Sequence, residues 1–77
     1  MGVLGAVMAT KISIADFAPR AHRSLTEFGY KVTLDFVTEE AQHLLMGHQP
    51  RGIIGLMMAE MLSQNDATLI YEKEAAP

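Results

Sequence analysis

Residues 30–63 read YKVTLDFVTEEAQHLLMGHQPRGIIGLMMAEMLS, and this stretch decides the predicted fold. Polar and apolar side chains alternate over residues 30–36, which is the pattern of a strand with one buried face. Thr38 then precedes two glutamates, which favours a helix start through hydroxyl capping and attraction to the positive helix end. We expect this helix to run to Met46 and to stop at Gly47.

Residues 53–62 are apolar except at Gly55 and Glu60. A helix that is apolar on nearly every face must be buried in a core or against a partner. Pro50 suits the first turn of this helix, because proline lacks an amide hydrogen that the first turn leaves unbonded. The stretch therefore predicts one strand followed by two helices.

Three further elements flank this stretch. Residues 11–14 alternate as a short strand, and Asp16 can cap a helix that carries apolar residues at helical spacing from Phe17 and stops at Gly29. Residues 67–72 are typical of a final strand. The predicted fold class is α+β, in the order strand, helix, strand, helix, helix, strand.

The chain is expected to form one compact domain over residues 10–73, with a flexible tail at residues 1–9 and another at 74–77. Residues 1–7 are too short and too free of basic side chains for a signal peptide or a membrane span, so we expect a cytoplasmic protein that does not act in a membrane. The predicted core or dimer seam consists of Phe17, Leu25, Phe28, Val32, Leu34, Phe36, Leu44, Leu45, Ile54, Met57, Met58, Met61, Leu62 and Ile70.

Composition favours self-association. The chain has 77 residues, of which 49% are apolar, its mean hydropathy is +0.15, and it contains no cysteine. A domain of this size is marginally stabilised by one core, and disulfides and thiolate zinc sites are excluded. A homodimer, or an obligate partner, is therefore expected.

The charge of the chain is unevenly distributed. Residues 1–37 carry a net charge of +1 and residues 38–77 a net charge of −4. Tight binding to nucleic acid is disfavoured, because phosphates are neutralised mainly by lysine and arginine. The acidic half favours a basic protein surface, and the predicted partner-binding residues are Glu39, Glu40, Glu60, Asp66, Glu72 and Glu74.

The residue types needed for catalysis or metal binding are sparse. Only His22, His43 and His48 are available as imidazoles, and none has the spacing of a metal-ligand pair. Glu39 and Glu40 are adjacent and so point about 100° apart on a helix, unlike paired catalytic acids. We predict no catalytic residues, no metal and no cofactor, and therefore not an enzyme.

The order strand, capped helix, short link and second helix over residues 30–63 resembles a ribbon-helix-helix repressor or antitoxin. In that family two strands pair into a ribbon that enters the DNA major groove. The resemblance implies a dimer, places Lys31, Thr33 and Asp35 on the base-reading face, and sets Arg51 near a phosphate. A dimeric DNA-binding protein is the alternative function.

The tetrapeptide Gly52-Ile53-Ile54-Gly55 is similar to the G-x-x-G loop of a KH RNA-binding core. The other interpretation is that these small glycines let the apolar helix pack closely against a neighbour.

Methionines recur at helical spacing in the apolar helix. They fill a core, or they line an adaptable protein-binding groove, because the unbranched thioether repacks at little cost. The residues predicted for a dimer seam or groove are Ile53, Met57, Met58 and Met61.

The leading functional hypothesis is a non-enzymatic protein-binding module, a stoichiometric regulator or inhibitor of a larger protein or nucleoprotein complex. A small, acidic, cysteine-free chain of this kind resembles phage-encoded anti-defence proteins such as anti-CRISPR proteins in general character.

Overall fold

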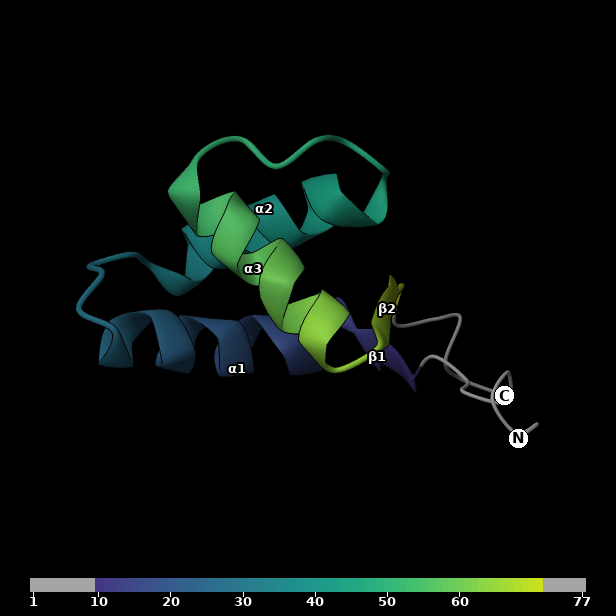
Figure 1. Cartoon of the computed structure of the whole chain (residues 1–77), viewed down its shortest axis with the longest axis horizontal. Coiled ribbons are helices and arrows are strands. Elements are labelled where there is room, and N and C mark those ends of the chain that lie inside the picture. The colour runs from purple at the N-terminus through teal and green to yellow at the C-terminus, as the bar shows by residue number, and fades with distance from the viewer. Residues whose placement is uncertain (1–9, 72–77) are drawn as a thin grey trace, which may run out of the picture.

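The computed structural model describes residues 10–71, which form three helices and two short strands (Figure 1). The predicted tails at 1–9 and 74–77 lie outside the described residues. In chain order the elements are β1 (Thr10–Ser13), α1 (Ile14–Glu27), α2 (Leu34–Leu45), α3 (Ile53–Gln64) and β2 (Ala67–Ile70).

The fold is α+β, as the sequence predicts. The strands β1 and β2 form a parallel pair in which Thr10 lies opposite Ala67 and Ser13 opposite Ile70. Both strands lie at one end of the molecule, whereas α1 ends and α2 and α3 begin at the other (Figure 1). The three helices thus connect the two strands, and among residues 10–71 no helix is long and apolar enough to cross a membrane.

α1 confirms the predicted apolar spacing but begins earlier than expected. The cap is Ser13, whose hydroxyl accepts a hydrogen bond from the Asp16 amide at 3.2 Å, so Asp16 occupies the first turn instead of capping it. The helix ends at Glu27, and Gly29 follows with a φ of 99°. A left-handed residue at this point is the usual end of a helix, and glycine adopts it without strain.

The strand predicted over residues 30–36 is wrong. Residues 30–33 form a connection without regular secondary structure, and α2 begins at Leu34, five residues before the predicted start at Glu39. Thr33, not Thr38, caps the helix, because its Oγ1 accepts a hydrogen bond from the Phe36 amide at 3.0 Å. The capped first turn has replaced the strand, since it places Val37 fully in the core.

The core is built mainly from α1 and α2, with single contributions from α3 and β2. Its buried apolar residues are Ile14, Phe17, Ala18, Ala21, Leu25, Val37, Ala41, Met58 and Leu69. The predicted core residues Phe17, Leu25 and Met58 are among them, and Val32, Leu44, Leu45, Ile54, Met57, Met61 and Leu62 pack against them partly buried, while Ile70 is half-buried.

Three predicted core residues are exposed. Phe28 follows the last turn of α1, and Leu34 and Phe36 belong to the first turn of α2; their exposed fractions are 71%, 44% and 45%. Phe28 leaves the core because α1 ends at Glu27, before it, and Leu34 and Phe36 leave it because the strand that would have aligned them does not form.

The position of the α2 cap can be tested with two matched threonines. We expect Thr33→Ala to lower the free energy of unfolding by about 1 kcal/mol, because the Phe36 amide loses its acceptor. Thr38→Ala is the control, since the Thr38 hydroxyl only donates to the Leu34 carbonyl within the helix. Urea unfolding, monitored by circular dichroism, measures the free energy of unfolding of both variants. A larger decrease for Thr38→Ala than for Thr33→Ala would contradict Thr33 as the cap.

Candidate functional site

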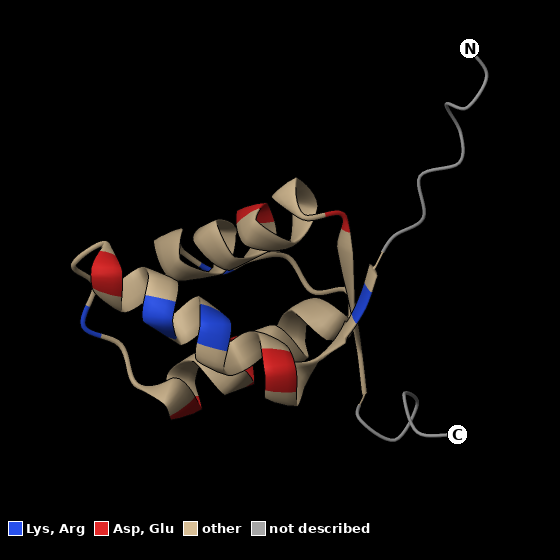
Figure 2. Cartoon of the chain, turned by 90° about the horizontal axis from the view of Figure 1, so that it is seen from below, with Lys and Arg blue, Asp and Glu red and all other residues tan. Residues whose placement is uncertain are grey.

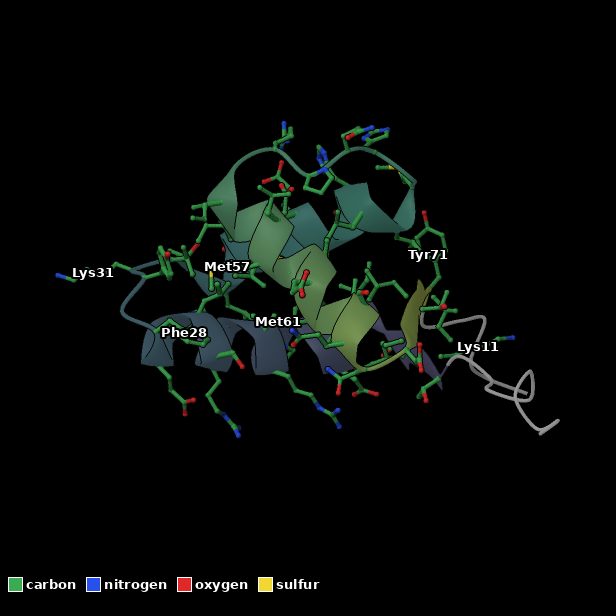
Figure 3. All side chains as sticks on the ribbon, in the orientation of Figure 1. Lys11, Phe28, Lys31, Met57, Met61 and Tyr71 are labelled. Atoms are coloured by element: carbon green, nitrogen blue, oxygen red, sulfur yellow. The ribbon has the colours of Figure 1, made fainter. Side chains whose placement is uncertain are left out.

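A groove of about 440 Å³ lies between α1 and the C-terminal half of α3. Met61 projects from α3 on the side that faces α1, as Figure 3 shows. We call this surface the α1–α3 groove, and its lining residues are Thr10, Ile12, Phe17, Arg20, Ala21, Ser24, Met61, Leu62, Asn65 and Ala67.

The groove has an apolar floor. Phe17 and Ala21 are core residues whose edges reach the groove, and Met61 and Leu62 remain only partly buried. α3 is apolar nearly all round, so packing one side of it against α2 leaves apolar side chains on its other sides. The groove therefore exposes some apolar surface, Met61 and Leu62 among it, beside the polar side chains of Thr10, Arg20, Ser24 and Asn65.

One charged residue lines the groove, and acidic residues lie on α3 and the turn after it without lining the groove. Arg20 is that lining residue on α1, whereas Arg23, one turn further along the same helix, does not line the groove. On the other side, Glu60 precedes Met61 and accepts a hydrogen bond from the Gln64 amide group at 3.1 Å, and Asp66 follows α3. Figure 2 shows these basic bands on α1 and acidic bands on α3 and the turn after it.

A second exposed apolar surface lies at the end of the molecule where α1 ends and α2 and α3 begin. We call it the apolar end. It consists of side chains from the terminal turns of three helices, each more than two-fifths exposed: Phe28, Leu34, Phe36, Ile53 and Leu56.

Glu40 corrects the prediction of an acidic binding surface. Its side chain is only 3% exposed and therefore cannot meet a partner. One carboxylate oxygen, Oε2, accepts a hydrogen bond from the Arg51 backbone amide at 3.4 Å, and the other, Oε1, pairs with the Arg51 guanidinium at 3.5 Å. Glu40 thus connects the middle of α2 to the start of α3.

The other acidic residues do not form one surface. Glu39 is exposed on α2, whereas Glu60 and Asp66 are exposed on α3 and the turn that follows it. Viewed along the direction of Figure 2, α2 and α3 lie on opposite sides of α1. Glu72 and Glu74 lie outside the described residues.

The four residues predicted for a dimer seam or groove separate in the structure. Met58 is fully buried in the core, and Met61 lines the α1–α3 groove. Met57 is partly buried beside the core, and Ile53 belongs to the apolar end. Sequence reasoning missed Arg20 and Ser24, although their i, i+4 spacing beside the apolar stripe of α1 would have placed them on one helix face.

The predicted nucleic-acid face is not assembled. Lys31 lies in a connection without regular secondary structure, Thr33 caps α2, and Arg51 pairs with Glu40. Because residues 30–36 form no strand, the ribbon of a ribbon-helix-helix protein has no structural counterpart here. Within the G-x-x-G tetrapeptide Gly55 packs closely against Glu40 and Pro50, as the packing interpretation predicts. That interpretation is wrong for Gly52, which has nothing within 4 Å of a Cβ position and instead caps α3 with a φ of 120°.

Within residues 10–71 no group of three histidine or acidic side chains is placed to hold a metal ion. His43 and His48 lie edge to face, with ring centroids 5.4 Å apart, at the end of α2. His22 has a structural contact instead, in which its Nε2 lies 2.9 Å from the Val32 carbonyl oxygen and ties α1 to the connection before α2.

Comparison with known proteins adds no relative: no protein-family model, curated protein or solved structure matches this chain. The groove and the apolar end must therefore be interpreted from their own chemistry.

The contact between Glu40 and α3 can be tested at Gly55. A Cβ at this position would lie 2.5 Å from Glu40 Oε2 and 3.3 Å from the Pro50 Cα, so the carboxylate would have to leave its buried site. We expect Gly55→Ala to lower the free energy of unfolding by about 1 kcal/mol or more, although alanine normally stabilises a helix interior.

A double-mutant cycle separates this contact from a general effect on α3. In a Glu40→Ala background the obstacle to the Gly55 methyl group is removed, so Gly55→Ala should cost less, with a coupling of about 0.5 kcal/mol or more. Ser63→Ala, on the exposed face of the same helix, is the control in both backgrounds. Equal effects of Gly55→Ala in the two backgrounds, measured by urea unfolding, would rule out the contact.

Proposed function

We propose that this chain is a non-enzymatic protein-binding module, a stoichiometric regulator or inhibitor of a larger protein or nucleoprotein complex, with an anti-defence inhibitor of the anti-CRISPR kind as its most concrete form. The observation that carries the proposal is the α1–α3 groove, which exposes apolar side chains between two helices. A groove of this kind accepts the apolar face of an amphipathic helix from a partner.

The charges beside the groove define the chemistry of that partner helix. Arg20 on the α1 side favours an acidic residue in the partner, and Glu60 and Asp66 on the α3 side favour basic residues. Met61 in the floor adapts to the shape of the inserted side chain at little cost. The proposed ligand is therefore a helix with an apolar stripe between one acidic edge and one basic edge.

Two pairs of matched variants test the groove. Ser24→Trp fills the groove from α1, and Thr26→Trp adds the same side chain at an exposed position of α1 that does not line it. Arg20→Glu reverses a charge at the groove, and Arg23→Glu makes the same change one turn away. We expect about tenfold weaker partner capture for Ser24→Trp and about fivefold for Arg20→Glu, with near wild-type capture by the two controls.

The measurement is affinity capture from lysate with and without nuclease treatment, with mass spectrometry of each retained protein and its molar ratio to the bait. The proposal is supported if one protein is retained by all folded controls, at a molar ratio to the bait near one to one, and is lost with the groove variants. Equal retention by the groove variants and their controls, or retention that disappears with nuclease, would contradict the proposal.

A further inference from the structure

We infer that the apolar end is the interface through which two copies of this chain associate about a two-fold axis. The inference does not depend on the proposed function, because the apolar end and the α1–α3 groove share no residue. The expected assembly is a homodimer in which both grooves remain available.

The apolar end gathers large side chains that a monomer leaves in water. Phe28, Leu56 and Ile53 are 71%, 59% and 57% exposed, and each is more than half uncovered. Phe28 follows α1, whereas Ile53 and Leu56 both belong to the first turn of α3, and Figure 3 shows Phe28 at the end of α1 with Lys31 beyond it. Exposed apolar side chains that gather in one place on a soluble domain mark an interaction site.

The exposed apolar area supplies a sizeable share of what a dimer interface requires. At about 200 Å² for a whole aromatic side chain, Phe28 and Phe36 alone expose about 230 Å². A standard interface buries about 800 Å² on each partner. The two phenylalanines thus supply more than a quarter of one side, and Leu34, Ile53 and Leu56 add to it.

The shape of the apolar end is already set in the single chain. The Thr33 hydroxyl caps the first turn of α2, and Glu40 holds the start of α3 against that helix. The turns that carry the apolar side chains are therefore held in place, and association does not have to order them first.

The charges around the apolar end favour a second copy as the partner, because both signs occur there. Glu27 and Asp35 are negative and Lys31 is positive, and all three are exposed. In a two-fold interface every contact occurs twice: when one residue of the first copy contacts another residue of the second copy, the same two residues also meet with the copies exchanged. A surface that carries both signs can satisfy this condition, with Lys31 of each chain facing Asp35 of the other, whereas a strongly acidic or basic partner would be repelled by one of them.

Size also favours this occupant. The chain has 77 residues and no cysteine, so its single small core has no disulfide to support it. A second copy is present at the same concentration wherever the chain is present, and dimerisation stabilises the folded state by mass action.

Sedimentation equilibrium over about a hundredfold range of concentration measures the association, because the dimer population depends on protomer concentration. The wild-type chain should approach twice its 8.4 kDa mass. Phe28→Glu and Leu56→Glu should raise the dimer dissociation constant by about tenfold or more. Met46→Glu is the matched control, since Met46 is 54% exposed but follows α2 at its other end, and it should leave the constant within about twofold.

A charge-swap experiment decides whether the second copy is the true occupant. Lys31→Glu alone and Asp35→Lys alone should each weaken the dimer about threefold or more, because each places like charges together twice. An equimolar mixture of the two variants restores both pairs in a mixed dimer, so its association should return to near the wild-type value. Native mass spectrometry identifies the mixed species when the two variants carry different isotope labels.

Each alternative outcome overturns the inference. A wild-type chain that stays monomeric over the whole range, or apolar-end variants that sediment like the Met46→Glu control, would show that this surface does not join two copies. A mixture that dissociates as readily as its components would exclude the two-fold contact of Lys31 with Asp35. Circular dichroism of every variant establishes that the fold is intact, which keeps these outcomes distinct from unfolding.

Discussion

The Glu40 carboxylate lies between the middle of α2 and the first turn of α3, and the position of α3 depends on it. A buried carboxylate is costly unless hydrogen bonds and an opposite charge compensate it, and here Arg51 supplies a backbone amide and a guanidinium. Gly55 leaves the space that the carboxylate fills, so residues from both helices define one contact. The contact thus holds the first turn of α3 against the middle of α2.

The orientation of α3 has consequences for the whole surface. With Gly55 and Met58 turned inward, Ile53 and Leu56 remain exposed in the first turn, and Met61 and Leu62 reach the gap beside α1. One apolar helix thus contributes to two separate surfaces, the apolar end and the α1–α3 groove. We propose self-association at the apolar end and partner binding at the α1–α3 groove.

Local signals explain which elements could be predicted. The α1 stripe, the two terminal strands and the apolar helix were recognisable because each depends on its own periodicity. The strand prediction for residues 30–36 failed because alternating polar and apolar side chains fit a strand and equally fit a connection that leads into a capped helix. Thr33 and Thr38 are both plausible caps, and the choice between them depends on burying Val37 against the core, which is a contact distant in sequence.

The sequence by itself determined the fold class, the methionine-rich apolar helix and the excess of apolar surface, since these depend on composition and on periodicity within single segments. It could not separate Glu39, which is exposed, from its neighbour Glu40, which is buried, because both are equally good residues for a first helical turn. Only the tertiary structure decided that difference, and with it the loss of a single acidic surface and the formation of the groove and the apolar end. The physical reason is that burial depends on which helices meet, and the approach of α3 to α2 leaves room for one carboxylate beside Gly55.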